Sequence, residues 1–70
     1  MGYLLKKEVS EEIKSKYKNS YISEKLGLST TYVSLIVHRH KAIPKITAYS
    51  FTKIIDSESE INDLFELVSE

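Results

Sequence analysis

The chain has 70 residues, of which 41% are hydrophobic, and this length allows one small domain with a compact core. It contains no cysteine, which excludes disulfide frameworks and zinc sites built on thiolates. No apolar run approaches the length of a membrane span and the N-terminus lacks an apolar signal core, so we expect a cytoplasmic protein.

Positive and negative side chains cancel overall but are unevenly distributed along the chain. Residues 1–53, the basic body, contain all ten Lys and Arg and four acids, which gives a net charge of +6. Residues 54–70, the acidic tail, contain six acids and no base, which gives −6. This asymmetry predicts an anionic partner for the basic body or a cationic partner for the acidic tail.

The hydrophobic spacing predicts five short helices and no strand, in a single domain over residues 1–70. The first helix is expected over residues 3–17, where apolar side chains recur at every fourth position: Leu5, Val9, Ile13 and Tyr17. Ser10 could instead cap a later start of this helix and leave the first residues as an arm.

Residues 19–38 have the pattern of two helices joined by a tight turn. The first helix, about residues 20–26, is followed by Gly27, a residue that tolerates the positive φ of a helix end. Ser29 can then cap the next helix, about residues 30–37. The apolar positions that hold the pair together are Ile22, Leu26, Leu28, Val33 and Ile36. This is the helix-turn-helix pattern.

The remaining chain predicts a basic loop and two more helices. His38, Arg39, His40 and Lys41 form the loop, and Pro44 makes an unbroken helix through it unfavourable. A fourth helix is expected over residues 47–56, with these side chains inward: Ala48, Phe51, Ile54 and Ile55. Ser57 and Glu60 have the spacing of a capping box for a fifth helix. That helix would be amphipathic through Ile61, Leu64, Phe65 and Val68.

The segment SEKLGLS resembles the AEKLGVS segment usual in the lambda-repressor-like helix-turn-helix family, the class of phage Cro and CI repressors. The apolar positions of the motif also stand where that family has them. The resemblance implies an all-α, compact five-helix domain with the helix-turn-helix as helices 2 and 3, working in the cytoplasm of a bacterial host cell. The chain departs from the family at Ser23, where an alanine is usual.

The resemblance implies a small phage-type transcriptional regulator that binds double-stranded operator DNA through the second helix of the motif. A homodimer is expected, because one short helix reads few bases. The family's base-reading positions correspond to Thr30, Thr31, Ser34 and Leu35. The predicted DNA-binding residues are these four together with Asn19, Ser29, Arg39 and Lys41.

An alternative function follows from the weak base-reading chemistry of these residues. None of the four reading positions carries the Arg, Lys, Asn or Gln that forms bidentate pairs with bases. Tyr32, with Leu35 and Val37, would add an apolar surface of the kind that binds proteins. The alternative is an antirepressor-type module that binds a partner repressor, through Tyr32, Leu35 and Arg39. The face of the fifth helix, with Leu67 beside it, could also meet a second copy.

Enzymatic chemistry is not expected from this sequence. His38 and His40 have no further His or Cys to complete a metal site. The chain has no glycine-rich phosphate loop and no evident pairing of a nucleophile with a base. We therefore expect no enzyme activity, metal, cofactor or small-molecule substrate.

Overall fold

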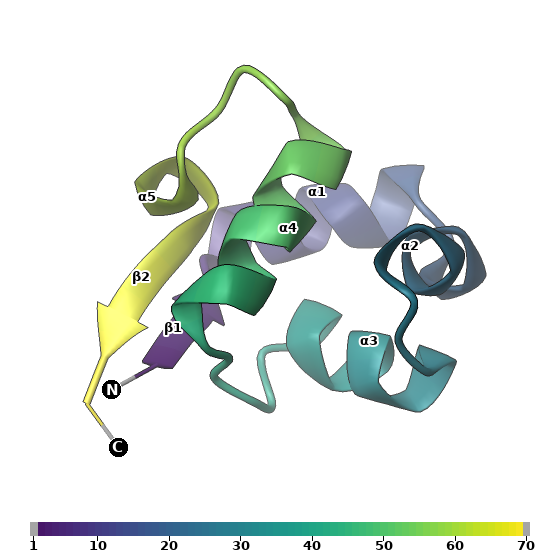
Figure 1. The fold of residues 1–70 in the computed structure, drawn as a ribbon, viewed down its shortest axis with the longest axis horizontal. Coiled ribbons are helices and arrows are strands. Elements are labelled where there is room, and N and C mark those ends of the chain that lie inside the picture. Colours follow the sequence, from purple (N-terminus) through teal and green to yellow (C-terminus); the bar gives the residue numbers. More distant parts are fainter. Residues whose placement is uncertain (1, 70) are drawn as a thin grey trace.

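Two short strands bring the two ends of the chain together. In the computed structural model, which describes residues 2–69, β1 (Gly2–Leu5) pairs antiparallel with β2 (Phe65–Val68), as Figure 1 shows. Ile43 lies beside β1, where Tyr3 N donates to Ile43 O at 2.8 Å and Ile43 N donates to Tyr3 O at 2.9 Å. The sheet therefore joins both ends of the chain to the segment that leads into the fourth helix.

The prediction of an all-α fold is wrong, because both ends of the described chain form strands rather than helix. The first helix was expected over residues 3–17, but its first three residues lie in β1. Leu5 is fully buried, as the predicted helical stripe required, but its side chain reaches the core from β1. In this segment the sheet provides hydrogen-bond partners for the backbone N–H and C=O groups, as a helix would.

The fifth helix is also shorter than its apolar spacing predicted. α5 (Ile61–Leu64) ends where Phe65 takes an extended conformation, with φ −121° and ψ 156°, and begins β2. Leu64 and Phe65 are both buried, one at the end of the helix and the other at the start of the strand. The expected cap by Ser57 and Glu60 is replaced by one in which Glu60 N donates to Asp63 Oδ2 at 2.8 Å.

Four longer helices make up the rest of the fold, and Figure 1 shows their arrangement. They are α1 (Lys7–Lys16), α2 (Asn19–Leu26), α3 (Thr30–Val37) and α4 (Lys45–Ile55). The predicted bounds of α3 are confirmed, and those of α2 are confirmed within one residue. α4 starts two residues earlier than predicted, directly after Pro44. Proline is tolerated at a helix start because the N–H that it lacks would have no partner within the helix.

The turn between α2 and α3 is closed as its sequence predicted. Gly27 has φ 72°, and its N–H donates to Ser23 O at 2.8 Å. Ser29 Oγ accepts from Tyr32 N at 3.1 Å, which confirms the cap of α3. The Ser23 hydroxyl donates to the carbonyl of Leu28, so the residue that departs from the family pattern adds a hydrogen bond across the turn.

The core lies between the helices and the inner face of the sheet. Phe51 of α4 and Phe65 of β2 meet edge to face, with ring centroids 5.6 Å apart. Ser10 is buried, and its hydroxyl donates to Val37 O at 2.5 Å, which joins α1 to the end of α3. Beyond the core, hydrogen bonds from Glu58 N and the Ser59 hydroxyl lower the pKa of Asp56 below its ordinary value. Within residues 2–69, no helix is both long and apolar enough to cross a bilayer.

Candidate nucleic-acid interface

The outward side of α3 is polar at its start and carries one apolar side chain further along. Figure 1 shows α3 at one edge of the molecule, with no other element beyond it in that view. Ser29, Thr30 and Thr31 are exposed, Ser34 is half-buried and Leu35 is 37% exposed. The capped first turn therefore presents two threonine side chains, which can exchange hydrogen bonds or contact a thymine methyl group.

The loop after α3 holds two histidines in a defined arrangement. His38 Nδ1 lies 2.9 Å from Ser34 O, and because a carbonyl only accepts, Nδ1 carries the proton of this hydrogen bond. The imidazole of His40 stacks on that of His38, with ring centroids 6.3 Å apart. Both histidines and Lys41 are exposed, so Nε2 of His38 and the Lys41 ammonium are accessible to an anionic ligand.

Arg39 holds the fold together at this loop. It has φ 61°, a left-handed conformation that is strained for a residue with a Cβ. Its Nε donates to Leu5 O at 2.7 Å, and its Nη2 lies 3.4 Å from Glu66 Oε2. The guanidinium, predicted to contact DNA or a protein partner, is thus half-buried and fastens the end of α3 to both strands.

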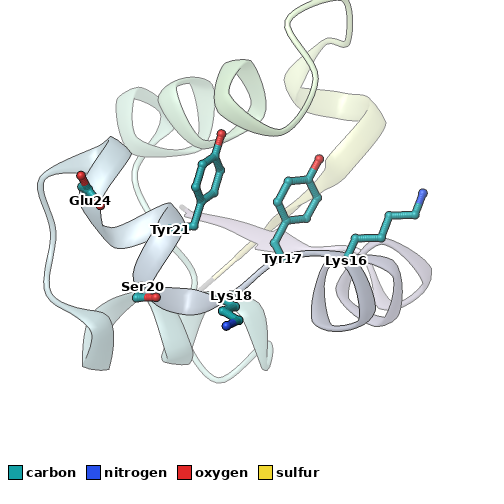
Figure 2. A pocket seen from close by; sticks show the side chains of 6 residues that line it. All are labelled: Lys16, Tyr17, Lys18, Ser20, Tyr21 and Glu24. Atoms are coloured by element: carbon teal, nitrogen blue, oxygen red, sulfur yellow. The ribbon is translucent and has the colours of Figure 1, made fainter.

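A second group of charged side chains lies near the start of α2. Asn19, predicted as a DNA-binding residue, is the first residue of this helix and is half-buried. Beside it lies an open groove of about 440 Å³, whose lining includes Lys16, Lys18, Ser20 and Glu24. Lys16 is paired with Glu12, with Nζ 3.2 Å from Oε2. Figure 2 shows Lys18 and Ser20 on one side of the backbone and the side chains of Tyr17 and Tyr21 on the other.

Tyr17 and Tyr21 form the aromatic wall of this groove. Their rings stack at a centroid distance of 6.1 Å, and Lys25 Nζ lies 5.7 Å from the Tyr21 ring. Tyr17 is fixed by its hydroxyl, which donates to Ile55 O at 3.4 Å. The sequence prediction missed Lys18 as a candidate contact, although a lysine shortly before a predicted helix start was a usable signal.

The apolar surface expected around Tyr32 is smaller than predicted. Val37 is fully buried, so it contributes nothing to that surface. Tyr32 is half-buried and packs against the core. Leu35 is therefore the part of the expected apolar cluster that is accessible to a partner.

The predicted site residues thus differ in role: several are exposed, and one is bonded within the fold. Thr30, Thr31 and Leu35 lie along exposed α3, and Lys41 follows in the loop, whereas Arg39 is committed to the sheet. Comparison with models of known families, with curated proteins and with solved structures found no match to this chain.

Proposed function

We propose that this protein is a small helix-turn-helix transcriptional regulator that binds double-stranded operator DNA through α3. The observation that carries the proposal is the exposed, capped first turn of α3, with Thr30 and Thr31 accessible and the turn before it closed at Gly27. A helix presented in this way enters the major groove with its N-terminal residues toward the base edges. The resemblance of residues 19–38 to lambda-repressor-like proteins supports the same use.

The charges near α2 and α3 support binding to the phosphate backbone. Lys18 directly precedes α2, and Lys41 follows α3 with both histidines beside it. Phosphate contacts of this kind supply most of the affinity and fix the register of the protein on the duplex. The reading residues themselves are hydroxyls and one leucine, so we expect modest discrimination between base sequences.

The test is a titration of the protein against labelled promoter DNA from its own locus, followed by fluorescence anisotropy at several salt concentrations. The logarithm of the affinity should fall linearly with the logarithm of the salt concentration, by about 0.9 per phosphate contact. Lys41→Ala should reduce this slope by about 0.9. Lys7→Ala, which removes an exposed lysine at the start of α1, should leave the slope unchanged.

The proposal fails if the promoter DNA binds no better than an unrelated duplex of the same length. Affinity that does not respond to salt would also contradict it, because every phosphate contact releases counterions.

A second candidate function is an antirepressor-type module that binds a partner repressor in place of DNA. The exposure of Leu35 in the middle of the α3 surface favours it, because a leucine contributes little to base reading. Leu35→Ala should then abolish co-purification with the repressor encoded nearby and leave the fold intact. If that variant keeps the repressor but loses operator binding, the DNA-binding function is favoured.

A further inference from the structure

The outward side of α4 carries Ile46, the most exposed large hydrophobic residue within residues 2–69. Ile46 is 77% exposed and Tyr49 is 53% exposed. These two residues and Ser50 are three and four positions apart, so they share one side of the helix, which we call the α4 outer face. The opposite side of α4, with Ala48 and Phe51, is fully buried. α4 therefore has apolar side chains on two sides: one side packs in the core and the other faces outward.

Two grooves flank the α4 outer face. Ile46 forms a wall of one groove, together with Leu26 and Leu28 from the end of α2 and the turn that follows. Tyr49 forms a wall of the other, and its ring is held by Lys53 Nζ at 5.5 Å from the ring centroid. The surface therefore has a projecting isoleucine beside an apolar hollow, a shape that can receive the same isoleucine from a second molecule.

The charges beside Tyr49 indicate the kind of partner. Lys45 and Glu60 both line the Tyr49 groove, yet within residues 2–69 they form no ion pair with each other. This surface carries both signs of charge around an apolar centre. It is complementary to a copy of itself, in which each Lys45 meets Glu60 of the partner subunit.

We infer that the α4 outer face is the interface of a symmetric homodimer, with the two α4 helices packed antiparallel. A two-fold axis perpendicular to α4 places each groove of one protomer opposite the same groove of its partner. Ile46 then enters the groove beside Leu28 of the partner subunit, and two Lys45–Glu60 pairs close the rim. The net charge of zero also favours self-association, because two copies do not repel each other through their net charges.

The test measures the oligomeric state by sedimentation velocity over a wide range of protein concentration, without DNA. We expect a reversible dimer for the wild type. Ile46→Glu should raise the dimer dissociation constant at least about tenfold, because a charge would be buried at the centre of the interface. Leu67→Glu is the matched control, since Leu67 is 52% exposed on β2, and it should leave the dissociation constant unchanged.

The ion pairs are tested by charge exchange. Lys45→Glu and Glu60→Lys should each weaken the homodimer, whereas an equimolar mixture of the two variants should form a heterodimer. The double variant should restore the homodimer, and circular dichroism checks that each variant is folded. A wild type that is monomeric at every concentration would overturn the inference. So would a dimer that withstands Ile46→Glu, or one lost with Leu67→Glu instead. Because no DNA is present, these results do not depend on the proposed DNA binding.

Discussion

At the scale of single residues, two polar side chains hold the α2–α3 unit in shape. Ser23 lies in α2, and its hydroxyl donates to the carbonyl of Leu28 in the turn. Arg39 stands at the other end of α3, and its side chain bonds to Leu5 O and approaches Glu66. The position of α3 thus depends on hydrogen bonds before and after it as well as on its apolar face.

Ser23→Ala should lower the free energy of unfolding by about 1 kcal/mol, because the half-buried carbonyl of Leu28 loses its donor. Urea denaturation followed by circular dichroism measures this change. Ser20→Ala is the control, since Ser20 is exposed on the same helix, and it should leave stability unchanged or slightly higher. Equal stability of Ser23→Ala and the wild type would show that the hydroxyl bond contributes nothing.

Arg39→Ala should destabilise the protein more than Arg39→Gly, by about 1 kcal/mol. Both variants lose the bonds to Leu5 and Glu66, but only glycine removes the strain of the positive φ. Glu66→Gln should have an effect below about 0.5 kcal/mol, because this ion pair is largely exposed. If both Arg39 variants are as stable as the wild type, Arg39 has no structural role and its guanidinium is available for a partner.

At the scale of elements, the middle of the chain could be predicted from sequence and its ends could not. Gly27 and Ser29 have local roles, a positive φ and a cap, so they marked the bounds of α2 and α3 correctly. β1 and β2 depend on each other across the whole chain, and local spacing contains no information about that pairing. Leu5 illustrates the problem, because a buried strand residue fitted a helical stripe by chance.

The candidate site shows the same division between local and distant contacts. The exposure of Thr30 and Thr31 follows from the phase of one helix and could be predicted. The role of Arg39 could not, because its partners Leu5 and Glu66 are 34 and 27 residues away.

Tyr3→Pro should lower the free energy of unfolding by about 2 kcal/mol or more. Proline removes the N–H that donates to Ile43 O, so the bridge between β1 and the segment before α4 loses one of its two hydrogen bonds. Thermal unfolding followed by circular dichroism provides the measurement. Tyr3→Phe keeps the backbone donor and should unfold near the wild-type temperature. If proline is tolerated as well as phenylalanine, the bridge between β1 and Ile43 does not stabilise the fold.

At the scale of the whole molecule, the charge asymmetry has both an internal and an external use. The Arg39–Glu66 contact joins the basic body to the acidic tail within one chain. The remaining basic groups near α2 and α3 are available for phosphates under the proposed function. The α4 outer face is a separate surface, and we assign it to a second copy.

Chemical-shift mapping by NMR tests the central claim, DNA binding through α3, most directly. Addition of promoter DNA to the ¹⁵N-labelled protein should shift the backbone amides of Thr30, Thr31 and Ser34 most strongly. The amides at the start of α2, near Lys18 and Asn19, should follow. Shifts confined to other elements, or no shift at low salt concentration, would contradict the account.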